Sequence, residues 1–326
     1  MSYRYPRQEY DISNLNIEAF RPLVDMTHHT GKSSHTNRTS PPEQYLQEGP
    51  ERKGSTCNNN GTNSPALTRY ATTNAPTQVP RTEAVYLDDA TLRTLTTDVL
   101  SSQSIPSLSE EEKALAKNVP AEDSAIIMRQ TIFYAQGGGQ PSDTGAIGPV
   151  DQDPTFEVSL VRKTSDDATS SFVAGQPVVQ KVDDSKRNYH SRLHTAGHIV
   201  GLAMQLLMPD KKKVKANHFP REASMEYEGL LYNEHKPVIQ EKVDELVRLD
   251  LPILISWLEG VAPVGDGEGA EGGRTRIASI GGLDHNPCGG THVARTSLVG
   301  SVVIRKISRQ KGISRVSYDV SPGIEG

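Results

Sequence analysis

Residues 191–207 read SRLHTAGHIVGLAMQLL, and the apolar periodicity of this stretch predicts the helix around which the rest of the chain is arranged. His194 and His198 lie four residues apart, so on a helix their imidazoles share one face. About ninety residues later the chain reads PCGGTHV at 287–293, where Cys288 and His292 are also four apart, on a glycine turn. The two pairs together offer three nitrogens and one sulfur.

This donor set is typical of a zinc site, because zinc favours tetrahedral coordination by nitrogen and sulfur. Either pair alone is a common coincidence, but both in one chain predict a metal site with His194, His198, Cys288 and His292 as ligands. His190 continues the same helix face. Eight residues of helix span about 12 Å, so one ion cannot bind all three histidines. We therefore expect His190 to be solvated, or to support the ligands from behind.

The composition limits what the 326 residues can form. Only 35% of them are hydrophobic and 5% aromatic, which predicts that part of the chain does not join a packed core. The formal net charge of -5 argues against a protein that coats nucleic acid, although it leaves room for a local basic patch.

The two cysteines, Cys57 and Cys288, suggest no disulfide framework, which favours a reducing compartment. The chain has no run of eighteen apolar residues and no signal-peptide pattern at its start. We expect a soluble cytoplasmic protein without a membrane segment. A mitochondrial location stays open, although acidic residues come early for a transit peptide.

Three regions are predicted along the chain. Residues 1–82 are rich in Ser, Thr, Asn, Pro and Gly and read as a disordered low-complexity extension. Residues 83–183 hold strand-length runs such as AVYLDD, SAIIM, FEVSLVRK and PVVQKVD, separated by turns, and predict a small antiparallel β-barrel domain. The glycines at 137–139 end one run with backbone that can take positive φ or approach a ligand closely.

Residues 184–326 predict an α+β zinc-binding domain of two helices and an antiparallel sheet. The first helix starts at a cap, Asp184 or Ser185, and carries both histidines. A second amphipathic helix is expected at 236–250, after a hairpin at 213–229. Further strands flank the Cys-His turn, and 259–275 reads as a flexible insertion.

A known family shows the same combination of motifs. RLHTAGH, CGGTH and the upstream FYAQGGGQPSDTG at 133–145 together resemble the editing domain of alanyl-tRNA synthetase and its free-standing relatives, the AlaX proteins. The resemblance covers about residues 83–322. In that family the HxxxH and CxxxH motifs hold zinc, which here implies His194, His198, Cys288 and His292. One position departs from the family, because Gln136 stands where a glutamate is frequent.

The resemblance implies a reaction, the ATP-independent hydrolysis of the ester in mischarged tRNA(Ala). The amino acid removed would be chiefly serine, with glycine as the second candidate. The stretch before residue 83 lacks the apolar content of an aminoacylation core, so the protein would act in trans. Because four protein ligands close a zinc site, two roles for zinc stay open: activating water, or only positioning the substrate.

Several side chains near the motifs are candidates for catalysis. Gln140 is placed to present its amide to a substrate carbonyl, Thr144 to bind a serine hydroxyl, and Thr291 to orient a metal ligand. Asp284 and His285, just before the metal turn, would activate water or cap a loop. Contact with tRNA is expected from two basic clusters: Lys211, Lys212, Lys213 and Lys215, and then Arg305, Lys306, Arg309, Lys311 and Arg315.

Two other functions remain open. The first is a zinc-stabilised tRNA-binding module without hydrolysis, for which Gln136 is the sequence hint. The second is an unrelated zinc hydrolase of small esters, which would leave the basic clusters without a purpose. The sequence does not indicate the oligomeric state.

Overall fold

The computed structural model describes residues 81–154, 156–163, 175, 177–259, 270–271 and 273–321. The predicted disordered extension up to residue 80, with Cys57, and residues 260–269 of the predicted insertion lie outside the described residues. The described chain is α+β, with few helices and mainly antiparallel strands, as the sequence predicted. It lies within one compact unit, 75–326. No described helix is both long enough and apolar enough to cross a membrane.

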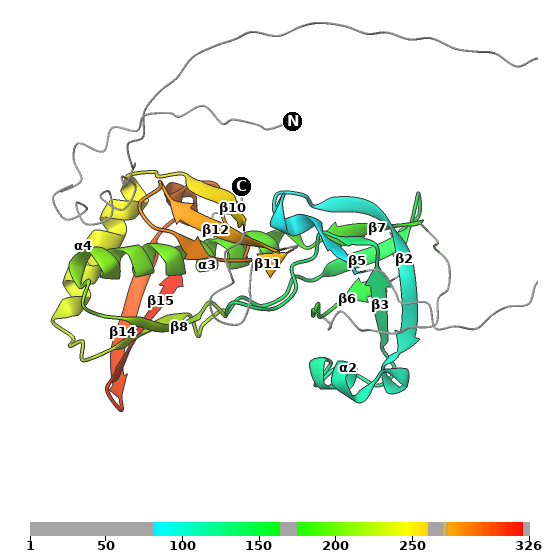
Figure 1. Ribbon diagram of the computed structural model, residues 1–326, viewed down its shortest axis with the longest axis horizontal. Coiled ribbons are helices and arrows are strands. Elements are labelled where there is room, and N and C mark those ends of the chain that lie inside the picture. The colour runs from blue at the N-terminus through cyan, green and yellow to red at the C-terminus, as the bar shows by residue number, and fades with distance from the viewer. Residues whose placement is uncertain are drawn as a thin grey trace, which may run out of the picture. The chain divides into compact units, whose positions relative to one another are not determined.

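The first large sheet is a half-barrel (Figure 1). Its five antiparallel strands, in spatial order, are β3 (Ser124–Met128), β2 (Thr94–Ser104), β7 (Pro177–Val182), β5 (Gly145–Pro149) and β6 (Phe156–Val158). The edge strands β3 and β6 do not pair with each other in the described chain, and both line a cavity of about 590 Å³. The predicted barrel is therefore open on this side.

Short elements surround the half-barrel. The predicted strand at 84–89 is wrong, because Val85–Leu87 is a 3-10 helix, η3, that follows the short strand β1 (Glu83–Ala84). Tyr86 and Leu87 are consecutive and both buried, so this run lacks the alternation of a strand that is buried on one face only. β1 pairs with β4 (Gln130–Thr131), η4 spans Ile105–Ser107, and α2 spans Glu110–Leu115 behind a Ser109 capping box.

The long helix α3 spans Asp184–Leu207. Its N-cap is Asp183, whose side chain accepts a hydrogen bond from the Lys186 N–H at 3.0 Å. The predicted cap at Asp184 or Ser185 is therefore too late, because both residues already have helical backbone. The second predicted helix is confirmed as α4 (His235–Arg248), which buries Ile239, Val243 and Leu246.

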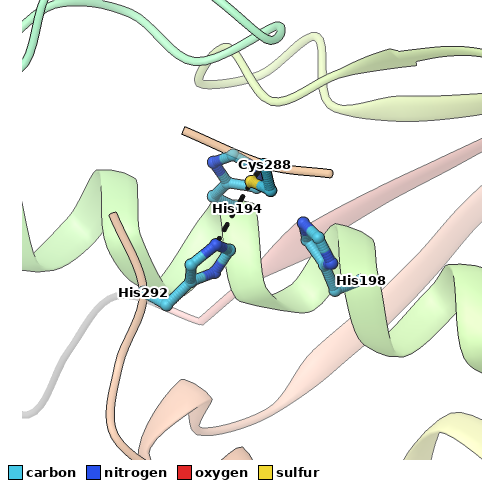
Figure 2. A group of neighbouring side chains, drawn as sticks. All are labelled: His194, His198, Cys288 and His292. Atoms are coloured by element: carbon cyan, nitrogen blue, oxygen red, sulfur yellow. Dashed lines mark hydrogen bonds between the residues drawn. The ribbon is translucent and has the colours of Figure 1, made fainter. Parts of the chain in front are cut away.

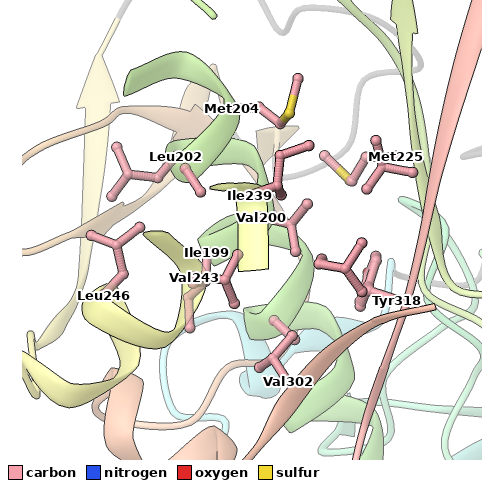
Figure 3. Close-up of a cluster of buried hydrophobic side chains, with 14 of the residues drawn as sticks. Ile199, Val200, Leu202, Met204, Met225, Ile239, Val243, Leu246, Val302 and Tyr318 are labelled. Carbon is pink, nitrogen blue, oxygen red and sulfur yellow. The ribbon is translucent and has the colours of Figure 1, made fainter. Parts of the chain in front are cut away.

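α3 and α4 share a core with the second large sheet. Its antiparallel strands, in spatial order, are β14 (Val302–Gln310), β15 (Ile313–Val320), β9 (Ser224–Glu228) and β8 (Lys213–Asn217). Figure 3 shows Ile199 and Leu202 of α3 in this core with Val243 and Leu246 of α4. The apolar stripe of the predicted histidine helix is thus buried on one side, which leaves another side for the site.

A third sheet holds the Cys-His turn. It joins β10 (Ile253–Glu259), β11 (Ala270–Glu271), β12 (Arg274–Ile280) and β13 (Asn286–Pro287), and the short η5 (Thr296–Val299) follows. β13 pairs with β12, and the Cys288 N–H then donates to the Arg276 carbonyl at 3.0 Å. This pairing fixes the backbone immediately before the CGGTH turn.

Candidate metal centre

The structure brings the four predicted metal ligands together (Figure 2). One ligand atom from each of His194, His198, Cys288 and His292 lies within 4.8 Å of the others. Cys288 Sγ is 3.4 Å from Nε2 of His194 and 3.4 Å from Nε2 of His292. Three imidazoles and a thiol at this spacing can hold a metal ion.

Gln140 holds the ring of His194 from the glycine-rich loop. Its Oε1 atom accepts from Nδ1 of His194 at 2.6 Å and from the Thr291 N–H at 3.1 Å, while its Nε2 donates to Thr291 Oγ1 at 2.9 Å. Because Nδ1 of His194 donates here, Nε2 is left unprotonated on the side of Cys288. Gln140 is fully buried, so its position favours an action through His194.

Thr195 holds the ring of His292 through Nδ1, as Gln140 holds that of His194. Its hydroxyl donates to the Ser191 carbonyl at 2.8 Å, so the oxygen is left to accept from Nδ1 of His292 at 3.3 Å and from the Val293 N–H at 3.2 Å. Nε2 of His292 then also faces Cys288 unprotonated. Sequence reasoning missed Thr195, although it directly follows a predicted ligand.

The surroundings keep the imidazoles uncharged. Burial is the main cause that lowers the pKa of His194, His198 and His292, and the neighbouring histidines and Arg276 lower each pKa further. The neutral imidazole is the form that binds a metal ion.

A buried arginine supports the Cys-His turn. Arg276, only 2% exposed, donates from Nη1 to the carbonyls of Cys288 at 2.7 Å and Gly290 at 3.1 Å, and from Nε to the Leu87 carbonyl at 2.8 Å. Burial lowers the pKa of this guanidinium, whereas Cys288 raises it. The turn is therefore tied to η3, a link that the sequence did not suggest.

A cavity of about 940 Å³ opens beside the metal group. It is lined by His194, His198 and Cys288, by Gly138 and Gly139, and by residues of β8 and the following turn. Gly138 and Gly139 have positive φ, 49° and 75°, as the glycine-rich run predicted. A Cβ at Gly139 would lie 2.7 Å from the Ala216 carbonyl oxygen, so this loop can lie so close to β8 only without side chains.

The cavity also contains a histidine that sequence reasoning missed. His218 is 3% exposed, and its ring stacks on His194 with centroids 4.2 Å apart. Burial, with a smaller contribution from Lys213, lowers the pKa of His218 to about 3. The only sequence signal was a histidine at the end of a predicted hairpin strand.

The other candidate residues differ in whether they contact the residues around the metal group. Thr291 contacts Gln140 and Ser191, as expected of a residue that supports a ligand. Thr144 accepts from Lys186 Nζ at 3.1 Å and is not among the described residues that line the cavity. The roles of Gln140, Thr144 and Thr291 in catalysis stay predictions.

Asp284 is buried and caps its loop, because it accepts from the Ile280 N–H at 2.7 Å and from Asn286 Nδ2 at 2.7 Å. His285 is exposed and lines the cavity. The expectation of a solvated His190 is wrong, because packing of α3 leaves it only 8% exposed, and its Nδ1 has no hydrogen-bond partner in the described chain.

The two basic clusters differ in position. Lys213 and Lys215 line the cavity. Residues of the second cluster, on β14, β15 and their connecting turn, are absent from the described lining. Its arginines are partly engaged, since Arg305 donates to the Tyr318 carbonyl at 3.1 Å and Arg309 to the Leu231 carbonyl at 2.9 Å.

Comparison with known proteins also relates this chain to aminoacyl-tRNA synthetases. Residues 275–317 match the threonyl and alanyl tRNA synthetase second additional domain, and residues 50–185 match the class II (A) tRNA synthetases. The alanine–tRNA ligase of Methanosphaera stadtmanae is 24% identical over 280 residues, which are 74% of this chain and 27% of that protein. The one of Methanococcus vannielii is 31% identical over 222 residues, 64% of this chain and 25% of that protein.

This chain is an AlaX-like relative of the alanyl-tRNA synthetase editing domain. It spans about a quarter of the length of the alanine–tRNA ligases that it matches. The match to the class II (A) tRNA synthetases begins at residue 50. The resemblance was expected to start only at residue 83. The match to the second additional domain contains both residues of the CGGTH pair and ends within β15.

Proposed function

We propose that this AlaX-like chain is a zinc-dependent aminoacyl-tRNA deacylase that acts in trans on tRNA(Ala) mischarged with serine or glycine. The observation that carries the proposal is the group of His194, His198, Cys288 and His292, of which the first three line a cavity of about 940 Å³. The relation to alanine–tRNA ligases supports tRNA(Ala) as the substrate.

The reaction is ester hydrolysis. The oxygen of a water molecule bonds to the carbonyl carbon, the bond from that carbon to the terminal ribose oxygen breaks, and the proton that water loses ends on the ribose oxygen. Zinc, when bound, supplies a Lewis acid that polarises a carbonyl or water. Gln140 and Thr195 fix the tautomers of His194 and His292.

Zinc fits the site because its donors are three imidazoles and one thiol, without a carboxylate. Calcium and magnesium prefer oxygen ligands. The positioning of two imidazoles by hydrogen bonds that Nδ1 donates is a feature that metal-binding histidines share.

The basic residues at the cavity suggest how the acceptor end of tRNA would lie. Lys213 and Lys215 line the cavity, so phosphates of the terminal nucleotides would contact them while the aminoacyl ester reaches the metal group. Affinity for tRNA should fall steeply with salt, and Lys215→Ala should reduce the slope of log affinity against log salt by about one. Lys306→Ala, measured by the same salt slope, tests whether the second basic cluster contacts tRNA.

Release of serine from Ser-tRNA(Ala), with Ala-tRNA(Ala) measured beside it, tests the function. The wild-type chain and Cys288→Ala are compared in buffer of controlled zinc content, with Cys57→Ala as the matched control at the other cysteine. We expect fast release of serine, sparing of alanine, loss in Cys288→Ala and no change in Cys57→Ala.

A folded, zinc-loaded wild-type chain that binds tRNA but releases no serine would contradict the enzyme and favour the zinc-stabilised tRNA-binding module. Hydrolysis of a small ester without any response to tRNA would instead favour an unrelated zinc esterase. Zinc content and tRNA binding are measured on the same samples, so the three outcomes are separable.

A further inference from the structure

His218 is held rigidly beside the metal group although it is not one of its four residues. It directly follows β8, and its backbone N–H donates to the Gly139 carbonyl of the glycine-rich loop at 2.7 Å. Its ring stacks on His194 at an interplanar angle of 19° and lies 6.5 Å from the ring of His198, centroid to centroid. The ring also lines the cavity.

A gap in the α3 side chains makes room for this ring. A Cβ at Gly197 would lie 2.3 Å from Cε1 and 2.5 Å from Nδ1 of His218. It would also lie 2.5 Å from the hydroxyl of Tyr318. Only glycine at this position lets the imidazole lie against the helix beside His194.

Tyr318 sets the tautomer of His218. Its hydroxyl is 2.5 Å from Nδ1 of His218 and 3.3 Å from the Leu193 carbonyl. The carbonyl can only accept, so the tyrosine proton goes to Leu193, and Nδ1–H of His218 donates to the tyrosine oxygen. Both protons then have an acceptor. The neutral ring is left with Nε2 as a hydrogen-bond acceptor.

The other polar groups at the cavity are less suited to hold a water molecule in one place. The side chains of Lys213, Lys215, Glu222 and His285 line the cavity but are exposed. The half-buried Asn217 and Asn286 also line it, but their side chains already bond to the Phe219 N–H and to the Asp284 carboxylate. The lysines can only donate hydrogen bonds. His218, in contrast, is buried, fixed by a tyrosine and in ring contact with a metal ligand.

We propose that His218 is a catalytic residue whose Nε2 atom accepts a hydrogen bond from the water that attacks the ester. This inference rests on the proposed deacylase function. Orientation of the nucleophile lowers the barrier because the reacting atoms are then already aligned. Tyr318 is a positioning residue in this scheme, since it acts only through the ring of His218.

Two substitutions at His218 separate the two ring nitrogens. His218→Asn places an amide donor near the Nδ1 position, so it can still reach Tyr318, but it removes the acceptor at Nε2. His218→Gln carries an amide oxygen near the Nε2 position. His235→Asn on α4 is the matched control, because His235 contacts Tyr232 and is not among the residues that line the cavity.

Single-turnover release of serine from Ser-tRNA(Ala) is measured for the full-length variants, together with tRNA affinity and bound zinc. We expect His218→Asn to lower the rate about 100-fold at unchanged zinc content and tRNA affinity, as misplacement of a reacting group does. His218→Gln should recover most of the loss, and His235→Asn should equal the wild type. Tyr318→Phe should lower the rate with zinc retained.

Three results decide the outcome. If the wild type hydrolyses Ser-tRNA(Ala) and His218→Asn does so at the same rate, the role of His218 is refuted while the deacylase stands. Loss of zinc in both His218 variants would also refute it, because His218 would then support the metal group. If the wild type itself is inactive, the proposed function has failed, independently of the His218 variants.

Discussion

Gly197 and Gly201 lie one turn apart on α3 and both line the cavity, yet their surroundings differ. A Cβ at Gly197 would overlap the ring of His218, whereas one at Gly201 would meet only the Cε atom of Met225 at 3.6 Å, an ordinary contact. The first glycine is required by packing. The second only weakens the helix.

The same substitution should therefore have opposite effects at the two positions. Gly201→Ala should raise the free energy of unfolding by up to about 1 kcal/mol, because alanine favours helix over glycine. Gly197→Ala should lower it by about 1–3 kcal/mol, because the overlap forces His218 and Tyr318 to move. Urea unfolding followed by circular dichroism checks both. Equal effects at the two positions would contradict the role assigned to Gly197.

Gln140 provides a second test at the scale of one residue. Gln140→Met keeps the length of the side chain but removes the acceptor for Nδ1 of His194, so zinc affinity should fall about 10–100-fold. Competition with a chromophoric chelator measures this change. Gln136→Met is the control in the same loop, since Gln136 bonds through its backbone N–H to the Val161 carbonyl and not through its side chain within the described part of the chain. A comparable loss in the control would indicate a general effect on the loop.

At the scale of elements, α3 is joined to the glycine-rich loop by a buried ion pair. Arg187 and Asp143 are 1% and 0% exposed, and Arg187 Nε lies 2.9 Å from Oδ2 of Asp143. Arg187 also donates to the Ile132 carbonyl at 2.6 Å and to the Ala90 carbonyl at 2.8 Å, and Asp143 accepts from the Tyr134 N–H at 2.7 Å. This pair fixes the loop that carries Gln140.

Arg187→Met should lower the free energy of unfolding by about 3–5 kcal/mol, because it leaves the Asp143 carboxylate buried without its partner. Arg129→Met is the control, since the Arg129–Asp98 pair is 56% and 43% exposed and should cost at most about 1 kcal/mol. Adding Asp143→Leu to Arg187→Met should restore part of the loss. Additive losses in the double variant would show that the two charges do not act together.

At the scale of the whole molecule, buried neutral histidines link stability to pH. Burial lowers the pKa of His190, opposed by Asp143 and Asp183 and assisted by Lys186 and Arg187. Its folded pKa is therefore below the value near 6.5 of the unfolded chain. Its contribution is complete above pH 6.5 and is lost as the pH falls below that value, because the unfolded chain then takes up the proton more readily.

The free energy of unfolding should accordingly fall as the pH is lowered from 7.5 to 5. Each such histidine contributes a slope of at most about 1.4 kcal/mol per pH unit. His190→Gln should make this dependence shallower, and urea unfolding at several pH values measures the difference. An unchanged pH dependence would mean that the folded chain accepts a proton at His190 as readily as the unfolded one.

The sequence by itself predicted the group of His194, His198, Cys288 and His292, because the two members of each pair lie within one local element. On a helix, a spacing of four places His194 and His198 on one face, and the glycine turn places Cys288 near His292. It also determined the α+β class, both long helices and the hairpin of β8 and β9. These features depend on side-chain periodicity and on turn residues that are close in the chain.

Only the tertiary structure decided what surrounds the ligands. Gln140 and His194 are 54 residues apart in sequence, and His218 and Tyr318 are 100 apart. Their hydrogen bonds depend on how whole elements pack, and periodicity within one element carries no record of that packing. For the same reason the sequence predicted a barrel but not its unpaired edges, and placed His190 in solvent although the packing of α3 buries it.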